Sequence, residues 1–111
     1  MTREAVIDRL QAGFDDGGFL DELARRVAVP TESQVPESAP HLLRYLREEI
    51  GPELASMDYA VEIIDNPVAG GGPFLIARRI EGAGLPTVMT YGHGDVVRGL
   101  AGDWKQGRDP W

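Results

Sequence analysis

Apolar residues recur at helical spacing through the first half of the chain, and this spacing predicts three helices. The first two cover residues 2–14 and 19–29, and Pro30 ends the second. A third covers residues 40–57, with a kink expected at Gly51-Pro52 because proline cannot donate a helical hydrogen bond. The apolar stripes consist of Val6, Ile7, Leu10 and Phe14, then Phe19, Leu20, Leu23 and Val27, then Leu42, Leu43, Leu46, Ile50 and Leu54.

Beyond residue 57 the pattern changes to short apolar runs separated by turn residues. These runs predict strands over residues 59–64, 74–80 and 87–92. The third run is continuously apolar, which favours a buried strand. The glycine cluster 70–72 is typical of a hairpin connection, because it lacks the Gly-Lys-Ser/Thr ending of a phosphate-binding loop. Helices followed by strands predict an α/β chain.

His93 and Asp95 directly follow the third predicted strand and are the strongest candidates for chemistry. Residues i and i+2 of an extended segment point to the same side, so the two side chains can converge. Imidazole is a good zinc ligand, and a carboxylate behind it fixes its tautomer. The flanking Gly92 and Gly94 let the backbone approach a site closely. The alternative interpretation is a polar turn in which Asp95 bonds nearby amides.

Composition and charge narrow the class of protein. The 111 residues carry 18 acidic and 11 basic side chains, a formal net charge of −7, and no cysteine. This excludes a basic surface for nucleic acid, disulfides and thiolate metal sites. Residues 1–66 hold 14 acids and 6 bases, as expected for solvated helix faces. The sequence shows no membrane-spanning run and no secretory signal, so we expect a cytoplasmic protein.

The run from Thr87 to Val97, followed by Trp104 and Asp109-Pro110-Trp111, resembles the zinc-dependent peptidase and amidohydrolase family. This family includes acetylornithine deacetylase, succinyl-diaminopimelate desuccinylase, aminoacylase, peptidase T and the glutamate carboxypeptidases. Its members carry an apolar strand, Gly-His-x-Asp-Val-Val, a Trp, and then Asp-Pro-aromatic. The upstream helices and the Val29-Pro30-Thr31-Glu32-Ser33 segment match its layout. Arg98 and Gly94 depart from the residues common at those positions.

The resemblance implies a role for each motif residue. His93 would bind one of two zinc ions, and Asp95 would orient His93 at the catalytic centre. Gly92, Gly94, Trp104 and Asp109, with Pro110 and Trp111, would be structural or line the rim of the site. The substrate would be an N-acyl amino acid, small peptide or related amide, and the parent protein would be a homodimer. His41 matches no motif and is interpreted as a surface or capping residue.

The family's remaining metal ligands and its general base have no counterpart in these residues. We therefore expect residues 1–111 to be the N-terminal segment of a catalytic domain, without the lid and dimerisation domain. The resemblance implies that the complete domain has helices around a larger mixed sheet, of which this segment holds an incomplete part. This segment would be inactive alone and prone to self-association through an open strand edge. Two alternatives stay open. One is a natural short binding or assembly module derived from the family, and the other is an unrelated α/β domain with a chance His-x-Asp pair.

Overall fold

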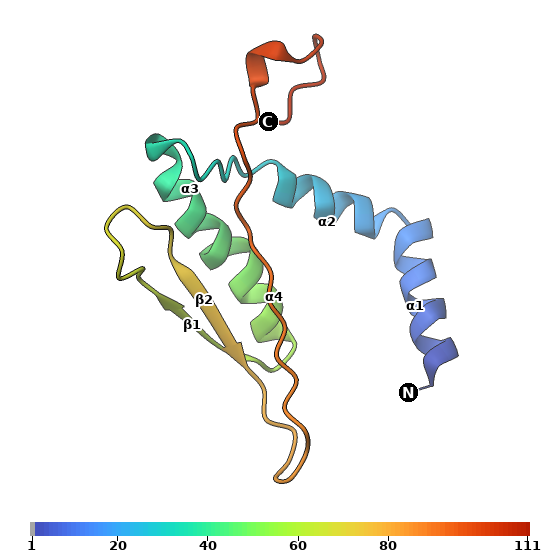
Figure 1. The fold of residues 1–111 in the computed structure, drawn as a ribbon. Coiled ribbons are helices and arrows are strands. Elements are labelled where there is room, and N and C mark those ends of the chain that lie inside the picture. Colours follow the sequence, from blue (N-terminus) through green and yellow to red (C-terminus); the bar gives the residue numbers. More distant parts are fainter. Residues whose placement is uncertain (1) are drawn as a thin grey trace.

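Two helices at the N-terminus form an arm on one side of the molecule. The computed structural model describes residues 2–111. Helix α1 spans Arg3–Asp15, and the Thr2 side chain caps it by accepting a first-turn backbone N–H at 3.2 Å. Helix α2 spans Gly18–Val27 and follows Gly17, whose left-handed φ of 86° favours glycine. Figure 1 shows α1 connected to the other elements through α2.

A single helical rod at the centre of the fold carries the arm. It starts with a 3-10 turn, η1 (Pro36–Ser38), and continues as α3 (Ala39–Arg44), the π-helical segment η2 (Tyr45–Ile50) and α4 (Gly51–Ser56). The expected disturbance at Gly51-Pro52 takes the form of this widened turn, in which the Gly51 N–H bonds to the Leu46 carbonyl. A π-turn relieves the clash that a proline ring makes with the preceding turn of an α-helix.

Ion pairs join the arm to this rod. The Arg25 Nε lies 3.0 Å from Glu49 Oε2, and the Glu49 side chain is only 13% exposed. Arg26 pairs with Glu22 on its own helix and reaches to 4.0 Å from Glu53 on α4. Partly shielded pairs of this kind are screened less by salt than fully exposed ones. They link α2 to the rod, whereas the apolar stripes of both α1 and α2 stay exposed.

The sheet is an antiparallel hairpin that packs one face on the central rod. Strand β1 (Ala60–Ile64) pairs with β2 (Phe74–Arg78), and Val61 lies opposite Ala77. Alternate residues of both strands are half-buried, as expected for a sheet with one covered face. Gly51 is needed by the widened turn itself, because a Cβ there would lie 2.9 Å from the Leu46 carbonyl oxygen, whereas its 3.7 Å distance from Val61 Cγ1 would be an ordinary contact. Helices with a small two-stranded antiparallel sheet are compatible with the predicted α/β class, but residues 2–111 do not form the mixed sheet that the family resemblance implies.

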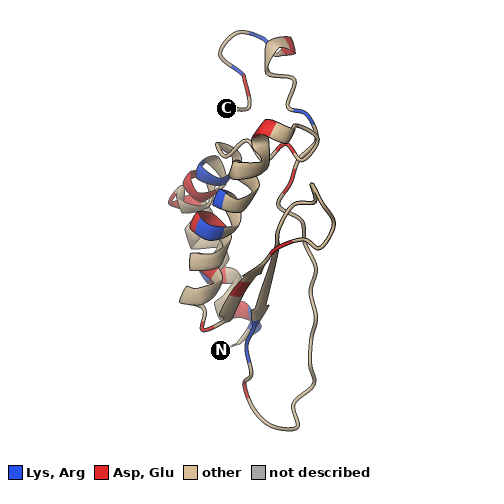
Figure 2. Ribbon diagram, turned by 90° about the vertical axis from the view of Figure 1, so that its left-hand side faces the viewer, with Lys and Arg blue, Asp and Glu red and all other residues tan. Residues whose placement is uncertain are grey.

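The third expected strand, over residues 87–92, is not formed in the structure. This segment has no ladder partner within residues 2–111, and Val88, Met89 and Tyr91 are 84%, 90% and 89% exposed. Figures 1 and 2 show it passing the hairpin without joining the sheet. The expectation of burial is therefore wrong for this chain. An apolar run sets the tendency to form a strand, but a strand also needs a neighbouring backbone to bond with.

The molecule is open and exposes much apolar surface. Its accessible surface is 9163 Å², whereas a compact protein of this mass exposes roughly 6,000 Å². Val29, at 4% exposed, is the single buried hydrophobic side chain among residues 2–111. Figure 2 shows many charged residues on the helices, whereas the extended segment 82–94 after the hairpin carries none. No helix in the described part of the chain is long and apolar enough to cross a membrane.

We expect the isolated chain to self-associate through the unpaired backbone of Thr87–Tyr91, because an extended apolar segment with free N–H and C=O groups pairs readily. Sedimentation velocity at increasing protein concentration measures this association. The substitution Val88→Lys should weaken it by placing a charge on the segment. The matched control is Val68→Lys, since Val68 in the hairpin loop is similarly exposed at 68%. A wild-type chain that stays monomeric at high concentration contradicts this prediction.

Candidate functional site

The loop that carries the candidate site is held by the segment between α2 and η1. The Val96 N–H donates to the Thr31 carbonyl at 2.9 Å, and the Ser33 N–H donates to the Val96 carbonyl at 3.2 Å. These two bonds form a parallel bridge between Glu32 and Val96. Thr31 is 3% exposed and the nearby Val29 4%. The best-buried part of the chain therefore lies where this segment meets the loop.

His93 and Asp95 converge as their spacing predicts. The His93 Nδ1 lies 3.1 Å from Asp95 Oδ1 and also 3.1 Å from the Asp95 backbone carbonyl. Both partners are acceptors, because a carboxylate and a carbonyl carry no proton to donate. The contacts are favourable when Nδ1 carries the ring proton and donates it. In the neutral imidazole, this leaves the lone pair on Nε2.

This arrangement is the one that a histidine metal ligand needs. A ligating imidazole usually donates its second ring N–H to a carboxylate or a carbonyl, which fixes the tautomer and raises the basicity of the other nitrogen. The His93 side chain is 70% exposed, so Nε2 is accessible to an external group. The Asp95 side chain is less exposed, at 44%. Asp95 is therefore placed to hold His93 from behind.

The charge of Asp95 is stabilised by its neighbours. The Ser33 side chain gives Asp95 a hydrogen bond, which is the largest influence and lowers the pKa of this carboxyl below its ordinary value. Desolvation by burial is the second influence and raises the pKa, and smaller contributions from His93 and from the Asp95 backbone lower it. The carboxylate thus stays ionised at neutral pH and can accept the His93 proton.

Gly94, between the two candidate residues, brings the loop against the central rod. A Cβ at Gly94 would lie 2.6 Å from Tyr45 Cε1, closer than side-chain atoms approach one another. A Cβ at Gly92 would meet no atom within 4 Å. Of the two flanking glycines, Gly94 is therefore the one that a close approach requires, and Tyr45 is the residue that it approaches.

The aromatic motif residues gather around Gly99 rather than around His93. The Trp104 indole N–H donates to the Gly99 carbonyl at 2.6 Å, and the Trp111 ring contacts the Gly99 Cα. Asp109 is exposed and makes no hydrogen bond or ion pair within residues 2–111. His41 lies in α3, on another element from the loop of His93.

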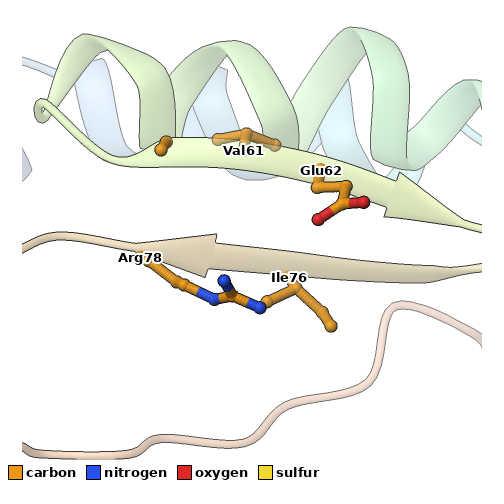
Figure 3. A pocket seen from close by; sticks show the side chains of 5 residues that line it. Val61, Glu62, Ile76 and Arg78 are labelled. Atoms are coloured by element: carbon orange, nitrogen blue, oxygen red, sulfur yellow. The ribbon is translucent and has the colours of Figure 1, made fainter.

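The described residues offer one credible zinc donor. Residues 2–111 contain no group of three His, Asp or Glu side chains that could hold a metal ion. The hollows on the surface lie elsewhere. One, of about 430 Å³, is lined by residues of α1, and another, of about 260 Å³, lies on the hairpin between residues that include Glu62 and Arg78 (Figure 3). Catalytic zinc takes three protein ligands, so His93 can supply only part of a site.

Three residues that support the loop are not identified by the sequence as site residues: Glu32, Ser33 and Tyr45. Each contacts the loop from a segment far away in the sequence, so local spacing carries no information about it. The one available signal is the short polar run Thr31-Glu32-Ser33 after Pro30, where the helical pattern stops. In the structure Thr31 is buried and Glu32 half-buried, so this polar connection is packed against the loop rather than free.

We expect Gly94→Ala to destabilise the fold by about 1–3 kcal/mol, because the new methyl group overlaps the Tyr45 ring. Urea unfolding measures the change. Gly92→Ala is the matched control and should have little effect. In a Tyr45→Ala background the cost of Gly94→Ala should largely vanish. An equal cost in both backgrounds would show that the loop does not pack on Tyr45.

The Asp95 carboxyl should titrate below the ordinary range, and Ser33→Ala should raise its pKa. A lowered pKa in the folded state means that the ionised group stabilises the fold at neutral pH, and that this contribution is lost as the pH falls through the folded-state pKa. NMR titration of the Asp95 carboxyl carbon measures this pKa in the wild-type chain and in Ser33→Ala. Gln34→Ala is the neighbouring control. An Asp95 pKa that Ser33→Ala leaves unchanged contradicts the contact.

Comparisons of this chain with protein families, with curated proteins and with solved structures find no match. The resemblance carried by residues 87–111 therefore stays a prediction from the sequence. The function proposed below draws its structural support from the geometry of His93, Asp95 and Ser33.

Proposed function

We propose that this chain provides the first zinc-ligating segment of a zinc-dependent amide hydrolase. In this role His93 binds zinc through Nε2, and Asp95 holds the imidazole from the other side. The observation that carries the proposal is the pair of 3.1 Å contacts from His93 Nδ1 to two acceptors of Asp95. They leave Nε2 as the exposed donor atom, which suits the imidazole chemistry of zinc sites.

The division of work among the chain's own residues follows from their contacts. His93 supplies the donor atom, Asp95 accepts a hydrogen bond from Nδ1–H, and Ser33 lowers the pKa of the Asp95 carboxyl further. Tyr45 supports the loop at Gly94. When bound, zinc supplies polarisation of an amide carbonyl and a lowered pKa for a coordinated water. Asp95 orients the ligand and is a positioning residue in this scheme.

The donor set fits zinc in kind but not in number. A catalytic zinc needs about three protein ligands, and the described residues provide one. The remaining carboxylate and imidazole donors, and the general base, would come from further polypeptide packed on this chain. Its surface supports this step, because it exposes roughly 3,000 Å² more than a compact protein of its mass.

The structure also gives some support to the alternative of a non-catalytic binding module. Helix α1 presents an apolar stripe of Ile7, Leu10 and Phe14, which are 46%, 69% and 56% exposed. Exposed apolar patches often mark interaction sites. Under this alternative α1 would bind a partner and His93 would have no metal role. The metal titration described next separates the two.

Zinc added to the isolated chain should perturb the His93 imidazole and leave His41 unaffected, because only His93 has its second nitrogen held by acceptors. NMR of the histidine side chains during a zinc titration measures this. Binding should be weak, since one ligand does not complete a site. His93→Gln should abolish the response, and His41→Gln should preserve it.

The same preparation should not hydrolyse N-acyl amino acids or dipeptides in the presence of zinc, because the residues that complete the site are lacking. Two results would count against the proposal. Equal responses of His41 and His93 would indicate non-specific binding. Rapid zinc-dependent hydrolysis by the isolated chain would show that a different, complete site exists in these residues.

A further inference from the structure

Gly99 is the point where three contacts meet. Its N–H donates to Glu32 Oε1 at 2.7 Å, and its carbonyl accepts the Trp104 indole N–H at 2.6 Å. Its Cα lies against the Trp111 ring, where a Cβ would clash. The next residue, Leu100, adopts a left-handed φ of 49°, so the chain turns sharply after Gly99. The aromatic rim, defined here as Trp104 and Trp111, is thus built around one glycine.

Glu32 makes the contact that ties this rim to the rest of the fold. Among residues 2–111, the hydrogen bond from Gly99 to Glu32 is the only one that joins residues 97–111 to the remainder of the chain. The other bonds of that segment are local, for example from Asp103 N–H to the Leu100 carbonyl. The Glu32 contact is part-buried and spans 67 positions of sequence.

The backbone around Glu32 is fixed independently of its side chain. The residues on either side, Thr31 and Ser33, bond to Val96 through their main-chain atoms. The Glu32 carboxylate therefore extends from an anchored segment and reaches Gly99, three residues beyond Val96. A carboxylate that accepts a backbone N–H makes a charge-assisted bond, which is stronger than a neutral one.

We propose that Glu32 is a positioning residue that fixes the aromatic rim relative to the loop of His93 and Asp95. The functional meaning of this placement rests on the proposed zinc site, because the rim gathers at Gly99, in the same segment of chain as His93 and Asp95. The contact itself does not depend on metal. Loss of the Glu32 carboxylate releases residues 99–111, while the bonds of Val96 keep His93 and Asp95 in place.

The test compares Glu32→Ala and Glu32→Gln in the whole chain by NMR. In Glu32→Ala, the Gly99 amide should exchange with solvent about tenfold faster, and residues 99–111 should become mobile in the ¹⁵N heteronuclear NOE. Glu32→Gln should retain most of the order, because the amide oxygen can still accept the Gly99 N–H. Glu37→Ala, an exposed acid of the same connection, is the matched control and should change neither quantity.

The outcomes separate this proposal from the zinc site. A rim that stays equally ordered in Glu32→Ala overturns the role of Glu32, whatever His93 does with zinc. A Glu32→Gln variant as mobile as Glu32→Ala overturns the assignment to this hydrogen bond. Released rim residues with unchanged His93 signals support the proposal, even if zinc titration fails. If circular dichroism shows that Glu32→Ala is unfolded, Trp104→Phe is the second variant. It removes the indole N–H that bonds to the Gly99 carbonyl and should also make residues 99–111 more mobile.

Discussion

The parallel bridge between residues 31–33 and Val96 is the contact on which the rest of the candidate site depends. It consists of two backbone hydrogen bonds beside the best-buried residues of the chain, Val29 and Thr31. Backbone bonds that are shielded from water are costly to leave unmade, so they hold the loop in one place. The bridge brings Ser33 to Asp95 and Glu32 to Gly99. The lowered pKa of Asp95 and the attachment of the rim therefore both follow from this one bridge.

The chemistry of His93 follows from what lies next to it. Both groups near Nδ1 are acceptors, so the imidazole gains by placing its proton there and its lone pair on Nε2. Ser33 contributes indirectly, because an ionised Asp95 accepts that proton better than a neutral one. Tyr45 supports the same loop through Gly94. These contacts leave His93 Nε2 as one exposed donor atom for a metal, and the described residues place no group of metal-ligating side chains around it.

Local features of the fold and site could be read from the sequence, and features that need a distant partner could not. The apolar stripes of α1 and α2 and the strain at Gly51-Pro52 are encoded within a few residues. The convergence of His93 and Asp95 is also local, because it needs only the alternation of an extended segment. The Glu32 contact joins residues 67 positions apart, and no periodicity reports it. The segment 87–92 has the composition of a strand, but composition does not supply a neighbouring strand.

The tautomer of His93 tests the central claim most directly. Long-range ¹H–¹⁵N correlation spectra, recorded where the imidazole is neutral, distinguish a proton on Nδ1 from one on Nε2. The account predicts that Nδ1 carries the proton, and that Asp95→Ala shifts the population toward Nε2–H. A His93 that is mainly Nε2–H in the wild-type chain would contradict the account, because the nitrogen assigned to zinc would then be occupied.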